Sequence, residues 1–173
     1  MILKPSELTQ YGKKCTTADE EATRGIREAE IFDVIPSIGA TLYEQIEQRP
    51  YDYEELLEGG VAFNKTGCIG GAAMLLGLKM AIAYYAEARI AQNNNVQLDR
   101  FGAKVKNSEY SSQAEKEMID SESVYLHTLG DKAMQSILDY LSTKKADPRY
   151  ALYIQRPNDD ERAQFEDITL VNP

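Results

Sequence analysis

Charged residues almost disappear from one stretch of the chain, residues 68–95, which reads CIGGAAMLLGLKMAIAYYAEARIAQNNN. Small side chains recur along it at steps of three, four and seven residues, with larger apolar side chains between them. This spacing predicts a helix that is apolar on almost every side and that a second helix can approach closely. We expect either the centre of a bundle or a helix that also contacts another subunit. The small residues taken as helix-packing or subunit-interface candidates are Gly70, Ala73, Gly77, Ala81 and Ala88.

Two other interpretations of this stretch do not fit its residues. A membrane span needs about 20 consecutive apolar residues, whereas Lys79 lies inside the run and Glu87 and Arg89 follow it. A lysine at the centre of a bilayer costs about 2.5–3.5 kcal/mol. A phosphate-binding loop needs a Lys-Ser or Lys-Thr pair after its glycines, and here alanines follow them. The stretch therefore predicts a helix buried in protein.

A second long helix is predicted between residues 112 and 145. Ser112 and Glu115 have capping-box spacing, and apolar residues follow at helical intervals. Gly130 is the position where we expect a kink. The predicted apolar stripe consists of Met118, Ile119, Tyr125, Leu126, Leu129, Ala133, Ile137, Leu138 and Leu141.

Shorter helices are predicted in the N-terminal third. Thr17 and Glu20 form a second possible capping box. Pro36 is expected to start a new helix, because proline is tolerated in a first turn but not in a helix interior. That helix ends near Arg49, and a further brief helix ends at the pair Gly59-Gly60, which acts as a C-terminal cap. The next residues, VAFNKTGC, are predicted to form a loop.

Two segments are predicted to be extended. Residues 96–110 are too polar and too interrupted for a helix, which indicates a hairpin or an arm. Residues 146–173 hold three of the six prolines and the β-like runs YALYI and DITLV, which fits either an arm docked on a neighbouring subunit or a disordered tail. Phe101, Tyr150 and Tyr153 in these segments are further interface candidates. The predicted fold is therefore mainly α: a helical bundle domain over residues 1–145, with long central and C-terminal helices, and an extended C-terminal arm.

The net charge of the chain limits the kinds of molecule that it can bind. The chain has 19 basic and 28 acidic residues, a net charge of -9, which disfavours binding of a nucleic-acid backbone over a broad surface. The first residues, MILKPSELTQ, lack the apolar segment of a secretory signal. Cys15 and Cys68 have no metal-binding spacing. We therefore expect reduced thiols and no zinc site.

The residues do not predict catalysis. His127 is the only histidine, and no ExxH pattern accompanies the acidic residues nearby, so no di-metal site is indicated. A nucleophilic mechanism lacks a convincing Ser-His or Cys-His pair. The chain has 11 tyrosines and no tryptophan, and tyrosine is typical of interfaces. We expect no enzyme, no cofactor and no metal.

Four segments in sequence order carry a resemblance to a known family: EIFDVIPSIGATLYEQI, YDYEELLEGG, GLKMAIAYYAEARI and RFGAKVKNSEYS. The chain resembles the head–tail connector (adaptor, head-completion) proteins of tailed bacteriophages over roughly residues 30–141. The resemblance aligns Gly59-Gly60 with a turn, residues 77–90 with the central helix and Phe101-Gly102 with the start of an extended loop. Residues after 147 do not match it.

The resemblance implies a structural protein of the virion neck that assembles in the host cytoplasm. It implies self-association into a ring, a dodecamer, with a portal protein above and a tail or further connector protein below. DNA would pass through the ring without specific binding, and part of the negative charge would line the channel. Membrane contact is not expected.

Two other functions remain open from the sequence. One is a small helical protein-binding or regulatory module that acts as a monomer or dimer. The other is an enzyme of a type that the motifs do not reveal.

Overall fold

The computed structural model describes residues 1–12, 19–64, 71–93, 96–99, 102–105, 113–151 and 153. The predicted fold class is confirmed, because the described part of the chain is mainly helical, with two short antiparallel hairpins. The elements are η1 Pro5–Glu7, α1 Leu8–Tyr11, α2 Asp19–Ala29, η2 Glu30–Val34, α3 Ile35–Ile38, α4 Ala40–Gln48, η3 Pro50–Tyr53, α5 Glu54–Glu58, β1 Ala62–Asn64, β2 Ala72–Met74, α6 Leu78–Asn93, β3 Val96–Asp99, β4 Gly102–Val105, α7 Gln113–Thr143 and η4 Pro148–Tyr150.

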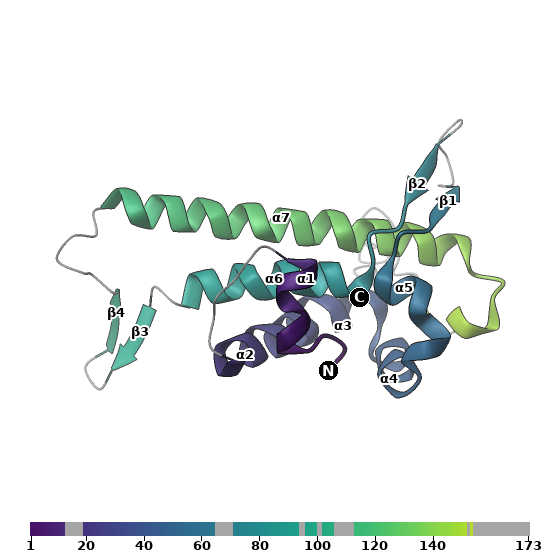
Figure 1. Ribbon diagram of the computed structural model, residues 1–173, viewed down its shortest axis with the longest axis horizontal. Helices are drawn as coiled ribbons and strands as arrows, with labels where there is room; N and C mark the ends of the chain where they lie inside the picture. The colour runs from purple at the N-terminus through teal and green to yellow at the C-terminus, as the bar shows by residue number, and fades with distance from the viewer. Residues whose placement is uncertain are drawn as a thin grey trace, which may run out of the picture.

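Helices α6 and α7 run side by side in opposite directions and form the long axis of the molecule (Figure 1). Helix α2 packs against α6 from another side. Helix α6 is consequently buried along nearly its whole length, as its apolar composition predicted. Its fully buried side chains include Leu78, Ala81, Ile82, Ala83 and Ala86.

The start of the central helix was predicted wrongly. Residues 72–74 form strand β2, which pairs with β1 in antiparallel register with Phe63 opposite Ala73. Helix α6 begins only at Leu78, after Gly77, whose φ of 88° is incompatible with a right-handed helix. A Cβ on Gly77 would lie 2.7 Å from the carbonyl carbon of Glu58. The glycine therefore serves a sharp turn at which two backbone segments meet, and it does not belong to a helix face.

Helix α7 runs without interruption through Gly130, so the predicted kink is absent. Gly130 instead allows close approach, because a Cβ there would lie 2.7 Å from Cδ1 of Tyr85 on α6. The predicted stripe is correct in the C-terminal part of α7, where Ala133, Ile137 and Leu141 are fully buried.

The predicted stripe is wrong toward the start of α7. Met118 is 71% exposed and Tyr125 is 50% exposed. The side chain of Ile119 lies outside the described residues, as do Thr17 and Ser112, the two predicted capping residues. Apolar side chains at this end of the helix therefore face outward although their spacing suits a core.

The helices before residue 50 differ from the prediction at Pro36. The chain continues from α2 through the π-helix η2 into α3, and Pro36 lies in the first turn of α3. The wider turn of a π-helix accommodates a proline, which has no N–H to donate to the preceding turn. The actual break falls at Gly39, with φ 88°. The predicted end of the next helix near Arg49 and the stop at Gly59-Gly60 are confirmed.

The segment from residue 96 contains the antiparallel hairpin β3–β4, in which Val96 pairs with Val105 and Asp99 with Gly102. This register leaves two residues to connect the strands. The hairpin lies beyond the C-terminal end of α6, while the β1–β2 hairpin projects near the opposite end of α7 (Figure 1). The predicted C-terminal arm is described only up to residue 151 and at residue 153, so the run DITLV lies outside the described residues.

Candidate functional site

Most of the predicted interface candidates that the structure describes take part in packing within the chain itself. Ala81 and Ala88 are buried in α6, and the hydroxyl of Ser123 on α7 donates a hydrogen bond to the Ala88 carbonyl at 3.1 Å. Ala73 lies in strand β2 and is partly exposed, and Gly77 forms the turn before α6. Gly70 and Phe101 lie outside the described residues.

The two tyrosines of the predicted arm also contact the helical body. The ring of Tyr150 is 2% exposed and makes edge contacts with Tyr53 and Tyr140, with ring centroids 5.7 Å and 6.1 Å away. Tyr153 is partly buried against the same core, and its N–H donates to the carbonyl of Tyr150 at 3.0 Å. The described start of the arm is thus docked on its own protomer.

An ion-pair cluster joins η2, α6 and α7. Asp33 accepts three hydrogen bonds from the Arg89 guanidinium, at 2.7, 2.9 and 3.0 Å. His127 places Nε2 3.9 Å from the Asp33 carboxylate and Nδ1 3.3 Å from that of Asp131. Tyr85 donates to Asp131 at 2.8 Å, and burial, followed by this hydrogen bond, raises the pKa of the Tyr85 hydroxyl. These contacts hold three elements together at fixed distances.

The cluster is not arranged for a nucleophilic reaction. Ser123, the buried hydroxyl one turn before His127, already donates to the backbone of α6. Among the described residues, no group of three or more histidine, cysteine or acidic side chains is placed to hold a metal ion. The lone histidine, which the sequence could not assign, therefore packs between two carboxylates and against the Tyr85 ring at 5.0 Å between centroids.

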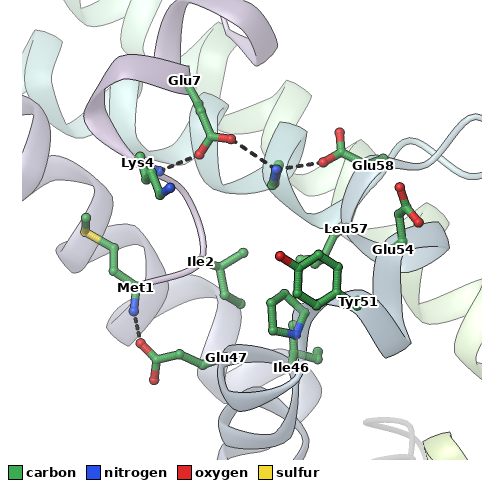
Figure 2. A pocket seen from close by; sticks show the side chains of 12 residues that line it. Met1, Ile2, Lys4, Glu7, Ile46, Glu47, Tyr51, Glu54, Leu57 and Glu58 are labelled. Carbon is green, nitrogen blue, oxygen red and sulfur yellow. Dashed lines mark hydrogen bonds and ion pairs between the residues drawn. The ribbon is translucent and has the colours of Figure 1, made fainter.

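A groove of about 350 Å³ opens between the N-terminal segment and the α4–η3–α5 region (Figure 2). Its apolar lining includes Ile2, Ile46 and Leu57, and Tyr51 lies at the groove with 91% of its surface exposed. Its charged lining consists of Lys4, Glu7, Glu47, Glu54, Glu58 and Lys79, together with the N-terminal ammonium of Met1, which pairs with Glu47. Among the described residues that line the groove there is no serine, cysteine or histidine.

Lys79 fixes one wall of the groove. Its ammonium group lies 2.6 Å from Glu58 and 3.2 Å from Glu7, and the Tyr11 hydroxyl donates to the other Glu58 oxygen. Burial opposes ionisation of Glu58, but the hydrogen bonds from Lys79 and Tyr11 outweigh it and lower the pKa of this carboxyl. Burial likewise opposes the charge on Lys79, yet its two carboxylate partners raise the Lys79 pKa.

The sequence contained a signal for this wall that its interpretation did not use. Lys79 is the only charged residue within the apolar run from residue 68 to residue 86, and it served only as evidence against a membrane span. A charge at the first turn of a buried helix requires a partner. Its partners come from residues 7 and 58, which are distant in sequence, so spacing alone did not reveal them.

A second surface feature consists of exposed apolar side chains on two adjoining elements. On η2, Ile31 and Phe32 are exposed, and the Arg89 guanidinium lies 5.4 Å from the Phe32 ring centroid. On α7, Met118, Val124 and Tyr125 are exposed. Met118 and Tyr125 are seven residues apart and so share one helix face. We take these exposed apolar side chains as a candidate interaction surface, because exposed apolar patches are typical of interaction sites.

Comparison with known proteins gives one match. The model of a family described as "Family of unknown function (DUF6712)" matches residues 34–163. No curated protein and no solved structure matches the chain. In the described part of the chain, no helix is long and apolar enough to cross a membrane.

Proposed function

Since the chain belongs to this family of unknown function, DUF6712, we propose its role from its own surface and from the resemblance of its sequence: a head–tail connector that forms a ring beneath a phage portal protein. The ring joins capsid to tail, and the genome passes through its lumen. The resemblance supplies the virion setting, the portal partner and the dodecameric stoichiometry.

The observation that carries the proposal is the outward-facing apolar surface on a helical body with a complete core. Phe32 is 63% exposed, and Met118 and Val124 are exposed on the long helix α7. The buried face of α7 is already occupied by α6, and these side chains stay exposed in the described part of the chain. Association with other chains would remove them from water, at about 25 cal/mol per Å² of apolar area.

Two hairpins support the same proposal. The β1–β2 and β3–β4 hairpins extend from different ends of the helical body (Figure 1). Two-stranded hairpins of three or four residues per strand are marginal in isolation, and they gain stability when they pack against another surface. In a ring, each protomer offers such projections to its neighbours and to the components above and below.

The direct test asks first whether a portal gene lies beside the gene of this chain, and then combines the purified chain with that portal protein. Mass photometry and electron microscopy are expected to show a ring of this chain on one face of the portal. A variant with Phe32→Ser and Val124→Ser tests the apolar surface and is expected to weaken ring formation while retaining the helical circular dichroism spectrum. As a control, Thr41→Ala changes an exposed position on α4 outside this surface.

The competing function is a small helical protein-binding or regulatory module that acts as a monomer or dimer. A chain that stays monomeric or dimeric in the presence of portal protein, and that forms no ring on it, contradicts the connector proposal and favours this module.

A further inference from the structure

Element η2 carries two exposed apolar side chains on a backbone that is held on both sides of them. The two side chains are Ile31 and Phe32. Just before them, the buried Glu30 accepts a hydrogen bond from the N–H of Ile2 at 2.6 Å. Just after them, Asp33 accepts three hydrogen bonds from α6. Because both neighbours are held in place, this turn has little conformational freedom to lose on binding, which favours affinity.

A cationic side chain lies beside these two apolar ones. Arg27 is exposed in the last turn of α2, four residues before Ile31, and α2 continues directly into η2. Side chains four residues apart on a helix are neighbours on one face. Arg27 forms no ion pair among the described residues, whereas the adjacent Glu28 lies 3.9 Å from Arg24. We call Arg27, Ile31 and Phe32 together the η2 surface.

The charges that line the groove between the N-terminal segment and α4–η3–α5 pair with one another at all but two positions. The cations are the Met1 ammonium, Lys4 and Lys79, and the anions are Glu7, Glu47, Glu54 and Glu58. The Met1–Glu47 pair and the contacts of Lys79 with two glutamates account for five of these seven charges. In the described part of the chain, Lys4 and Glu54 form no ion pair. Figure 2 shows these two residues on different sides of the groove.

Glu54 is the unpaired charge on the apolar side of the groove. It lies near Leu57 and Tyr51 (Figure 2), and Ile46 and Pro50 also line the groove. Pockets for small ligands measure about 300–1,000 Å³, so a groove of about 350 Å³ has room for one or two side chains of a partner. This side of the groove therefore suits an apolar side chain with a cation next to it.

We propose that the groove binds the η2 surface of a second copy of this chain. Phe32 of that copy packs against Tyr51 on the apolar side of the groove. Its Arg27 pairs with Glu54, because a guanidinium offers a carboxylate a fixed fork of N–H donors. Aromatic side chains and arginine are also enriched at the centre of protein interfaces. The inference rests on the proposed self-assembly and names the two surfaces that meet in it.

The occupant is a second copy because the two complementary surfaces face different ways on one molecule. Glu30 contacts Ile2, which lines the groove. Phe32 follows Glu30 by two residues, about half a helical turn, and its ring lies against Arg89 of α6 instead. Phe32 thus points away from the groove of its own chain. Different surfaces that complement each other give head-to-tail association, which closes into a ring when the rotation between copies allows it.

The charged half of the contact is tested by a charge exchange in the full-length chain, with sedimentation velocity or mass photometry over a concentration series. Glu54→Lys and Arg27→Glu each place like charges across the contact, so each is expected to weaken self-association about tenfold. In an equimolar mixture of the two variants, alternating copies pair opposite charges again. The double variant exchanges the two charges in every contact. Both samples are expected to recover most of the wild-type association.

The apolar half is tested by Phe32→Ala and Tyr51→Ala. Each is expected to weaken self-association about tenfold or more, because a few aromatic side chains carry much of the energy of such contacts. The two changes break the same pair of rings, so the double variant should lose less than the product of the two single effects. Losses that multiply fully would place the rings in separate contacts and contradict the proposal.

Two matched controls separate this contact from a general charge effect. Glu44→Lys changes an exposed glutamate on α4 that does not line the groove, and Lys145→Glu changes an exposed lysine after α7. Both are expected to self-associate like the wild type. Circular dichroism and the thermal midpoint establish that the variants fold. Glu54→Gln and Arg27→Gln replace any charge reversal that lowers the thermal midpoint.

Four results would overturn the inference: a wild-type chain that stays monomeric alone and with portal protein, single variants that associate normally, a mixture without recovery, or a Glu54→Lys chain that loses only portal binding. Portal binding is measured in parallel. A chain that self-associates through this pair but ignores the portal contradicts only the connector role. Portal-bound rings that form equally well with Glu54→Lys contradict only the η2 contact.

Discussion

At the scale of single residues, charges and glycines have roles that depend on neighbours distant in sequence. Lys79 links residues 7 and 58, and Arg89 links α6 to Asp33. Gly77 allows the turn before α6 to lie against the backbone of Glu58. Their partners are distant in the sequence, yet each residue sets where the central helix begins or how it is held.

Replacement of Lys79 tests the wall of the groove. Lys79→Met keeps the length and apolar stem of the side chain but leaves Glu7 and Glu58 without their cation. We expect the free energy of unfolding in urea at neutral pH to fall by about 1 kcal/mol, a value reduced for the partial exposure of both carboxylates. Lys145→Met, at an exposed lysine, serves as the control and should leave stability unchanged.

The difference in stability between wild type and Lys79→Met is expected to depend on pH in a defined direction. The pKa of Glu58 in the folded chain lies below its ordinary 4.5, so the ionised carboxylate stabilises the fold above that pH. This contribution is lost as the pH falls below 4.5 and through the lowered pKa. Wild type and Lys79→Met should therefore converge in stability in acid. A gap that stays constant to the lowest pH at which both chains fold would contradict the pairing.

The turn before α6 gives a comparison between two glycines. Gly77 and Gly39 share a φ of 88°, but a Cβ at Gly39 meets nothing within 4 Å, whereas one at Gly77 meets the backbone of Glu58. Gly39→Ala is expected to cost about 1–3 kcal/mol from backbone strain alone. Gly77→Ala should cost a further 1–3 kcal/mol or so, because the backbone has to move apart. Urea unfolding measures both, and equal losses would exclude the close contact.

At the scale of elements, the packing of α6 depends on glycines on the helices beside it. A Cβ on Gly130 of α7 would lie 2.7 Å from the Tyr85 ring, and one on Gly25 of α2 would lie 2.7 Å from Ile90. Small residues in the sequence of α6 indicated close packing, and glycines of α2 and α7 also approach large residues of α6 closely. The ion-pair cluster around Asp33 then joins η2 to α6 and α7.

Gly130→Ala tests the α6–α7 contact. On an isolated helix, alanine in place of glycine stabilises by about 1 kcal/mol. Here we expect a net loss of about 1–2 kcal/mol, because the methyl group displaces the Tyr85 ring or the helix. In a chain that also carries Tyr85→Leu, which removes the ring, Gly130→Ala should lower the free energy of unfolding by less. If Gly130→Ala alone is more stable than wild type in thermal unfolding, the space between α6 and α7 is large enough for the added methyl group, and the close contact is contradicted.

At the scale of the whole molecule, charge and exposed apolar surface define what the chain can meet. The net charge is -9. The large apolar residues that are exposed in the described part of the chain lie on η2, on α7, in strand β2 and at the groove. A protein of this charge gains little from phosphate contacts. The described surface thus combines a surplus of negative charge with exposed apolar side chains, the two properties that the proposed connector needs.

This balance predicts the behaviour of the chain toward DNA. At about 0.15 M salt, the assembled protein is expected to leave linear double-stranded DNA unshifted in a gel and unchanged in fluorescence anisotropy. The physical reason is like-charge repulsion. Binding that weakens steeply with added salt would reveal a basic surface in the assembly and would contradict an acidic lumen.

The sequence alone determined the features that follow from composition and period: a mainly helical chain, a central helix buried on nearly all sides, the C-terminal half of the α7 stripe, and the stop at Gly59-Gly60. These depend on local hydrogen bonding and on the repeat of apolar positions, which neighbouring residues encode directly. The extended segment after residue 96 was also recognisable, because its polar residues interrupt any helical period.

Only the tertiary structure decided the rest. Strand β2 forms inside a helix-like stretch because β1 offers it a partner and because Gly77 turns the backbone, which propensity cannot encode. Met118 and Tyr125 are exposed because α6 covers another face of α7, and the groove exists because residues 1–7 meet α4, η3 and α5. Contacts between distant segments set which apolar residues are buried and which charges pair, so they decide where this protein can bind a partner.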